Sequence, residues 1–205
     1  RGEKNSATFE IQTGIKPHVG GLKKFLALKP ECPSFAIVAV GIEMLAETTR
    51  TLLDYGVGKI LLEKPGVADV NEINELVNMA NLANADVFLA YNRRFYTSVL
   101  EAERIIKEDG GVTSFHFEFT EWSHVIAQLD REEITLKNWL LANSSHVIDT
   151  AFFLGGRPAS LAAFRKGATK WHPSGSIYAG AGESTSGALF SYHANWEAPG
   201  RWSIE

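Results

Sequence analysis

The chain has 205 residues, of which 45% are hydrophobic and 21% are charged, enough for one large domain or two small ones with real cores. Its net charge of -4 and isoelectric point near 5.9 argue against the basic surface that binds nucleic acid or anionic membranes. No apolar run approaches the roughly 18 residues that span a bilayer, and no basic-then-apolar leader opens the chain. We therefore expect neither nucleic acid nor a membrane as a partner.

Cysteine and histidine usage bears on the compartment and on metal binding. The single cysteine, Cys32, rules out an internal disulfide and fits a reducing compartment, which predicts a cytoplasmic protein. It lies in a proline-flanked loop with no CxxC partner, so we interpret it as structural. Outside residues 145–149, the histidines lack the spacing of metal ligands, and no metal site is predicted.

The first half of the chain alternates between strand-like and helix-like segments. Predicted strands cover residues 8–13, 34–40, 59–63 and 86–91, and predicted helices cover 22–28, 43–55 and a segment that begins at 69. The runs 34–40 and 59–63 are continuously apolar, which is typical of strands buried on both faces of a parallel sheet. This order predicts a Rossmann-like, doubly wound α/β sheet with right-handed crossovers.

The second half has the pattern of an α+β domain. Residues 112–122 alternate, with Phe115, Phe117 and Phe119 on one face and polar residues on the other, as in a half-exposed sheet. Further strands are predicted at 160–164, 187–196 and 201–204, and helices at 97–108 and 144–154. Residues 123–140 are interpreted as a surface excursion, and Gly180 to Gly182 as a hairpin loop.

We place the domain boundary within residues 92–96. The predicted domains are a partial dinucleotide-binding domain at residues 1–93 and a substrate and oligomerisation domain at 94–205. The second domain is expected to be an open, mostly antiparallel sheet with helices on one face, truncated at its C-terminus.

A charged turn follows the apolar run 59–62. Pro65 cannot donate to a strand ladder, so it ends the strand and leaves Glu63 and Lys64 at its carboxyl end. Open α/β sheets bind ligands at this edge. The alternative is a surface ion pair at a strand end.

Three short motifs resemble one family. Residues 63–65 (EKP), 91–95 (YNRRF) and 145–149 (SHVID) occur in the order found in the glucose–fructose oxidoreductase and inositol dehydrogenase family (Gfo/Idh/MocA). EKP alone is a weak signal, but the three motifs in this order and spacing are fairly specific. The resemblance runs from about residue 34 to the end.

The resemblance implies an NAD- or NADP-dependent oxidoreductase acting on a sugar, a cyclitol or a sugar derivative, and a homo-oligomer formed through the second sheet. By position it implies catalytic Lys64 and His146. It implies cofactor contacts from Gly41, Ile42, Glu63, Lys64 and Asn92. Candidate substrate contacts are Arg93, Asn143 and Asp149.

The chemistry of these residue types is consistent with that assignment. Hydride transfer at a sugar carbon obliges a proton to leave or join the hydroxyl, and the group that carries it works best with a pKa near the working pH. A lysine starts near a pKa of 10.4 and needs burial or a neighbouring cation. Histidine starts near 6.5, and Asp149, one turn beyond His146, could orient it.

Structural interpretations remain open for the same residues. His146 could be a core histidine, and Asp149 is better explained as a structural hydrogen-bond partner than as a proton carrier. Asn92 could form a turn, and Arg93 and Arg94 could tie down the linker as well as bind an anionic substrate group. The five tryptophans, which include Trp122 and Trp171, suit sheet core or a subunit interface better than sugar stacking.

Two departures from the family pattern favour a rival interpretation. Many members carry a carboxylate four residues before the motif histidine, and this chain has Ala142 there. No GxGxxG loop is present to hold a pyrophosphate. We expect the chain to be a fragment whose first two strands and glycine loop precede Arg1. The rival is a non-catalytic descendant that serves as a binding or oligomerisation scaffold.

The alternating strand predicts how its two faces are covered. A helix should cover the face with Phe115, Phe117 and Phe119, and another subunit should cover at least part of the opposite face. Light scattering should therefore detect an oligomer, and a monomer at high micromolar concentration would contradict the expectation.

The missing glycine loop predicts weak dinucleotide binding by the 205-residue chain. Pyrophosphate affinity comes mainly from the loop's backbone N–H groups and the helix dipole behind them. Losing several charge-assisted bonds, each worth roughly 1.5–3 kcal/mol, should cost orders of magnitude in affinity. Calorimetry that gave low-micromolar affinity for NADH or NADPH would instead direct attention to Gly20 and Gly21.

Overall fold

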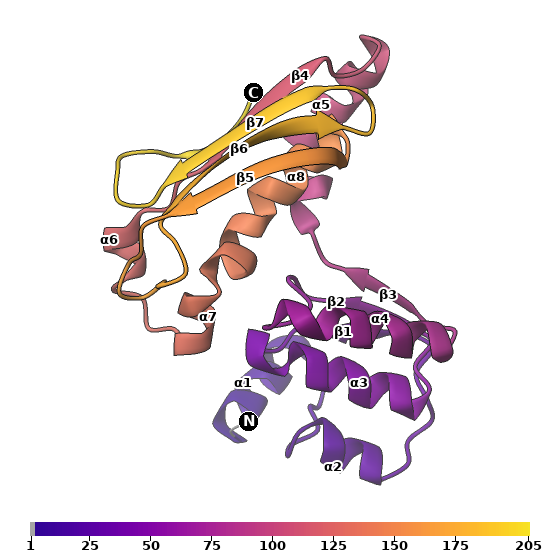
Figure 1. Cartoon of the computed structure of the whole chain (residues 1–205). Helices are drawn as coiled ribbons and strands as arrows, with labels where there is room; N and C mark the ends of the chain where they lie inside the picture. The colour runs from indigo at the N-terminus through magenta and orange to yellow at the C-terminus, as the bar shows by residue number, and fades with distance from the viewer. Residues whose placement is uncertain (1–2) are drawn as a thin grey trace. The chain divides into compact units, whose positions relative to one another are not determined.

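A computed structural model describes residues 3–205 (Figure 1). The chain forms two compact units, the first ending at Leu89 and the second running from Ala90 to Glu205. This division falls slightly earlier than the boundary drawn from the sequence.

The first unit is built on a three-stranded parallel sheet in the order β1-β2-β3. Its strands are β1 (Ala36–Val38), β2 (Lys59–Leu62) and β3 (Asp86–Leu89). Its helices are α1 (Glu3–Thr13), α2 (Leu22–Ala27), α3 (Leu45–Tyr55) and α4 (Ile73–Leu82), with 3-10 turns η1 (Ile42–Met44) and η2 (Val70–Glu72). The predicted parallel sheet is confirmed.

Helices α3 and α4 pack against one face of this sheet. Both crossovers step in the same direction along the strand order, so right-handed connections place both helices on one side. Val38, Ile60 and Leu62 lie beneath them, all at most 2% exposed. On the other face, Ile37 is 67% and Phe88 is 56% exposed. The expectation that residues 34–40 are buried on both faces is therefore wrong within the described chain.

The predicted strand at residues 8–13 is also wrong, because these residues belong to α1. Gly14 donates its N–H to the Glu10 carbonyl at 2.8 Å, and the Thr13 hydroxyl donates to the Phe9 carbonyl at 2.8 Å. Such bonds are local, whereas a strand needs a neighbouring strand to satisfy its backbone. Two alternating apolar residues were too weak a pattern to separate these outcomes.

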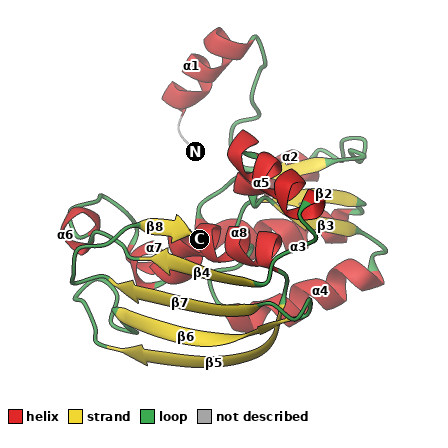
Figure 2. Ribbon diagram, turned by 90° about the horizontal axis from the view of Figure 1, so that it is seen from above, coloured by secondary structure: helices red, strands yellow, loops and turns green. Residues whose placement is uncertain are grey.

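The second unit is built on a five-stranded mixed sheet in the order β5-β6-β7-β4-β8, which Figure 2 shows side by side. Its strands are β4 (Ser114–Phe119), β5 (Pro158–Lys166), β6 (Ile177–Ser184), β7 (Leu189–Asn195) and β8 (Trp202–Ile204). Its helices are α5 (Thr97–Glu108), α6 (Ser123–Ile126), α7 (Glu133–Lys137) and α8 (Ser145–Gly155), with turns η3 (Asn92–Phe95) and η4 (Leu140–Ser144). Only the β4–β7 pair is parallel, so the sheet is mostly antiparallel, as predicted.

Helix α8 covers the aromatic face of β4, which confirms that half of the sheet prediction. Phe152 of α8 meets the Phe115 and Phe117 rings edge-on at 5.9 and 5.4 Å between centroids. Phe117 and Phe119 are 1% and 2% exposed. This row of rings is the core on which the second unit is built.

The interpretation of Gly180 to Gly182 as a hairpin loop is wrong. These residues lie in the middle of β6, which pairs with both β5 and β7. A Cβ on Gly180 would overlap the Tyr192 ring, and a Cβ on Gly182 would overlap the Ser160 backbone. The glycines make room for these neighbours, which a single sequence does not reveal.

Candidate functional site

Lys64 lies in a tight turn at the carboxyl end of β2. The Glu63 N–H donates to the Val38 carbonyl at 2.9 Å, and the Gly66 N–H donates to the Glu63 carbonyl at 3.0 Å. The Lys64–Pro65 peptide is cis. Gly66 has a φ of +88°, and a Cβ there would meet Leu89 at 2.7 Å. The turn therefore keeps Lys64 at the edge of the parallel sheet.

Gly41 and Ile42 lie at the same edge, because they follow the adjacent parallel strand β1. The Met44 N–H donates to the Gly41 carbonyl at 2.8 Å, which starts the η1 turn. The first unit thus brings together Gly41, Ile42, Glu63 and Lys64, four of the predicted cofactor contacts. Their contact with a cofactor stays a prediction.

The glycine pair at residues 20 and 21 offers no substitute for a pyrophosphate loop. Both residues have positive φ, at 106° and 86°, and they precede α2. Helix α2 has only six residues and follows no strand of the sheet. The predicted cofactor contacts among the described residues are therefore those expected at the nicotinamide end.

In the second unit, the turn η3 carries Asn92, Arg93 and Arg94. The Asn92 N–H donates to the Ala90 carbonyl at 2.9 Å. Arg94 donates from Nε to Asp149 Oδ2 at 2.8 Å and from a second guanidinium nitrogen to Oδ1. Two parallel charge-assisted bonds of this kind fix orientation as well as adding stability. They join η3 to the middle of α8.

This pair changes the interpretation of Asp149. The sequence suggested that Asp149 could orient His146, but its carboxylate is engaged by Arg94. The hydrogen bonds to Asp149 are the main reason that the pKa of Arg94 is raised. The Asp149 side chain is 12% exposed, whereas the Arg94 side chain is 40% exposed, so the pair lies at the surface with its carboxylate end largely buried. The contact agrees with the interpretation in which Arg94 ties down the linker.

His146 lies in the first turn of α8, beside Tyr91. The two rings meet edge-on, with 6.3 Å between centroids and 86° between planes. Burial raises the pKa of Tyr91, and a hydrogen bond with Ser145 opposes that rise. The second unit therefore brings Tyr91, His146, Arg94 and Asp149 together on one side of α8.

The start of α8 differs from the prediction. The helix was expected to begin at residue 144, but it continues from a π-helical turn, η4, and has no side-chain cap. The Ser144 hydroxyl instead donates to Glu121 Oε1 at 2.7 Å, and Asn143 Nδ2 donates to the same oxygen at 3.0 Å. These side chains hold the turn before His146 from outside the helix.

Glu121 is the functional candidate that the sequence analysis missed. It is 7% exposed, and burial raises the pKa of its carboxyl, opposed chiefly by the hydrogen bonds from Ser144 and Asn143. The Trp139 indole also lowers this pKa, although its Nε1 makes no hydrogen bond of normal geometry. The sequence contains a signal for this position, because Glu121 is the next residue in the alternating series of inward-facing positions Phe115, Phe117 and Phe119.

The predicted substrate residues have structural partners in the second unit. The Arg93 guanidinium lies 4.5 Å from the centre of the Trp202 ring. Asn143 is bound to Glu121 and Asp149 to Arg94. These contacts agree with the structural interpretations given above, and substrate binding by Arg93, Asn143 and Asp149 stays a prediction.

Residues 3–205 contain neither a grouped metal-ligand set nor a membrane-spanning helix. No three histidine, cysteine or acidic side chains among them are placed so that they could hold a metal ion. Within the same residues, no helix is both long and apolar enough to cross a membrane.

Comparison with solved structures places the fold among nucleotide-dependent dehydrogenases. Levoglucosan dehydrogenase in complex with NADH matches with a TM-score of 0.79 at 20% identity, over 100% of this chain and 59% of that one. The WlbA dehydrogenase from Bordetella pertussis, in complex with NADH and UDP-GlcNAcA, matches with a TM-score of 0.76 at 15% identity, over 99% and 60%. A protein from Desulfitobacterium hafniense, described as an NADPH-dependent oxidoreductase, gives 0.78 at 21%, over 100% and 60%.

These likenesses show the fold alone. Comparison with protein-family profiles and with curated protein sequences gives no match. The chain spans about 60% of the length of the structures it matches. It has the Rossmann-like parallel sheet and the following mixed sheet of these oxidoreductases.

The buried Glu121 carboxyl predicts a measurable pH dependence. Its pKa is raised above the ordinary value of 4.5, so the folded unit prefers the protonated form. The stabilisation is complete below about pH 4.5 and is lost as pH rises through the pKa of the folded state. Its size is about 1.4 kcal/mol for each tenfold difference in proton affinity between the folded and unfolded states. Glu121→Gln should remove this dependence.

All five tryptophans lie in residues 90–205, so their fluorescence follows unfolding of the second unit. The urea midpoint of the wild type, measured relative to that of Glu121→Gln, should decrease as the pH is raised from 4 to 7. Exposed Glu183→Gln serves as the control. A difference that stayed flat or rose with pH would contradict the assignment.

Proposed function

We propose that the chain is part of an NAD- or NADP-dependent oxidoreductase that transfers a hydride between the nicotinamide and a sugar, a cyclitol or a sugar derivative. The observation that carries the proposal is Lys64, held at the carboxyl edge of a parallel sheet in a chain that matches NADH-bound sugar dehydrogenases over its whole length. The motif order of the Gfo/Idh/MocA family supports the same conclusion.

The residues have distinct roles in this proposal. The nicotinamide end of the cofactor is contacted by Gly41, Ile42, Glu63 and Asn92. When bound, the nicotinamide supplies the hydride donor or acceptor. Lys64 carries the proton of the reacting hydroxyl. His146, beside Tyr91, is the second proton-handling group. Substrate binding involves Arg93, Asn143 and Asp149. These side chains contact the substrate themselves or stabilise the turn beside it.

The outer face of the second sheet supports the proposed homo-oligomer. Phe164 and Leu189 are 69% and 63% exposed, and they share the face opposite α8 with the His116–Ser191 hydrogen bond of 2.9 Å. Exposed apolar side chains of this size are suited to burial by a second copy. The exposed single cysteine, Cys32, agrees with the reducing cytoplasm as the compartment.

The test is deuterium transfer from 4-deuterated NADH or NADPH to candidate carbonyl sugars such as L-sorbose, a compound bound in one matching structure. Mass spectrometry detects a few turnovers, so weak cofactor binding does not hide the reaction. Lys64→Met should lower the rate by roughly 10²–10⁴-fold. The same substitution should have little effect on the contacts between the protein and the nicotinamide, which saturation-transfer NMR measures.

The matched control is Lys59→Met, which removes an exposed lysine from the opposite end of the same strand. It should leave transfer unchanged. Equal rates for Lys64→Met and wild type would remove Lys64 from the mechanism. Bound cofactor without transfer to any tested sugar would favour the non-catalytic scaffold, which the Ala142 substitution already suggests.

A further inference from the structure

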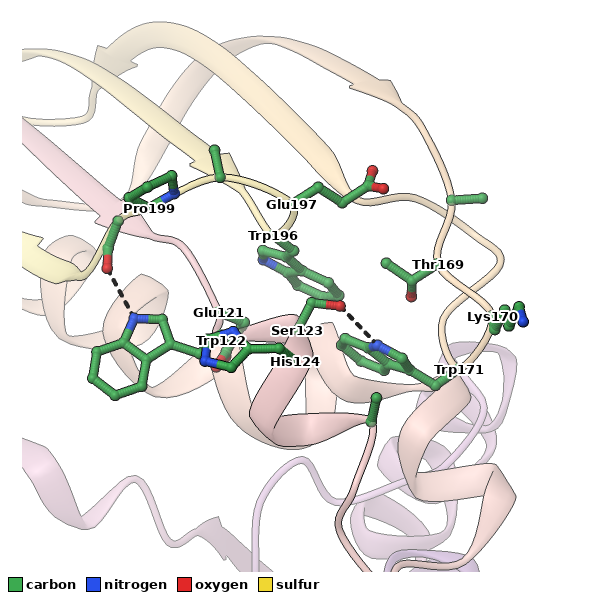
Figure 3. Close-up of a pocket in the computed structure, with 14 residues that line it drawn as sticks. Glu121, Trp122, Ser123, His124, Thr169, Lys170, Trp171, Trp196, Glu197 and Pro199 are labelled. Carbon is green, nitrogen blue, oxygen red and sulfur yellow. Dashed lines mark hydrogen bonds between the residues drawn. The ribbon is translucent and has the colours of Figure 1, made fainter.

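The second unit has a large cavity at one end of its sheet (Figure 3). Its volume is about 960 Å³, and its walls come from the loops that follow β4, β5 and β7. Three indoles line it, those of Trp122, Trp171 and Trp196. Ligand sites commonly combine aromatic walls with a few polar groups, and this size is ample for a small molecule.

The indoles are held in fixed orientations by their own N–H groups. Trp122 donates to the Gly200 carbonyl at 3.0 Å, and Trp171 donates to the Ser123 hydroxyl at 3.0 Å, both drawn in Figure 3. Trp196 donates to the Phe119 carbonyl at 3.2 Å. Because these donors are engaged within the protein, the rings offer a ligand their faces and not their N–H groups.

The three rings are not equivalent. Trp171 and Trp196 stack on each other, with 5.4 Å between centroids and 6° between planes, and Trp196 is only 1% exposed. Trp122 is 59% exposed. The cavity therefore offers one broad exposed indole, whereas cages for quaternary ammonium groups enclose the cation with several aromatic faces.

Polar groups stand beside the exposed indole. Figure 3 shows His124 and Ser123 next to Trp122, with Glu121 close behind. Ser123 uses its oxygen as the acceptor for Trp171, which leaves its hydroxyl proton to donate. A flat apolar surface with donors and acceptors at its margin matches the ring of a sugar, which presents C–H groups on its faces and hydroxyls at its edge.

We propose that Trp122 is the stacking platform for the ring of a neutral sugar or cyclitol, with His124 and Ser123 at the hydroxyl edge. The ligand class rests on the proposed function. The cavity also has a physical link to the candidate catalytic helix, because Glu121 at its wall accepts from Ser144, two residues before His146. Trp122 is then the residue that selects the ring.

The experiment follows the indole N–H resonances of the 205-residue chain in ¹H–¹⁵N spectra, without cofactor. Methyl β-D-glucopyranoside, myo-inositol and tetramethylammonium are titrated separately. Trp122→Phe identifies the Trp122 resonance and retains an aromatic face. The sugars should shift this resonance, Trp122→Ala should weaken their binding roughly fivefold or more, and Trp122→Phe should weaken it less.

Phe9→Ala, which removes an exposed aromatic side chain from the first unit, should leave sugar binding unchanged. Sugars that shift no indole resonance, or that bind Trp122→Ala as well as wild type, would overturn the proposal. Tighter Trp122-dependent binding of tetramethylammonium would overturn the ligand class. The titrations contain no cofactor and report binding alone, so a failure of hydride transfer remains distinguishable from a failure of the platform.

Discussion

The packing of α8 against the phenylalanine row of β4 is the interaction on which the second unit's candidate site depends. Helix α8 carries His146 and Asp149, so any shift of the helix on the sheet moves both. Gly155 lies so close to the Phe115 ring that a Cβ would overlap it, which sets how near the helix can approach. Phe152 then contacts three rings of the sheet from the same helix. The register of α8 on β4 is thereby defined by shape and not by polar contacts.

Much of this could be predicted from the period of the sequence. Strict alternation at residues 114–119 specified both the strand and the face that α8 covers. The same period, continued by one step, places Glu121 inward, where it meets Ser144. The parallel sheet of the first unit followed from apolar runs of strand length, and Pro65 marked the end of β2, where Lys64 lies.

The remaining features depend on contacts between distant residues. Helix α1 and the central glycines of β6 were misassigned because local composition does not show whether a neighbouring strand is present. The bond between Arg94 and Asp149 joins residues that are 55 positions apart. The π-helical turn before α8 is held by Glu121, which is 23 positions from Ser144. No local pattern encodes such pairs.

Glu121 contacts or lines three parts of the second unit. It lies two residues after β4, the strand whose rings form the core, its carboxyl group accepts from the turn that precedes His146, and its side chain lines the indole cavity. Single π-helical turns next to α-helices are frequently found at functional sites. The hydrogen bonds from Ser144 and Asn143 to the buried Glu121 carboxyl group stabilise this turn, and the loss of either partner would leave a buried acceptor less satisfied. The strand core, helix α8 with His146 and the indole cavity are therefore linked through one side chain.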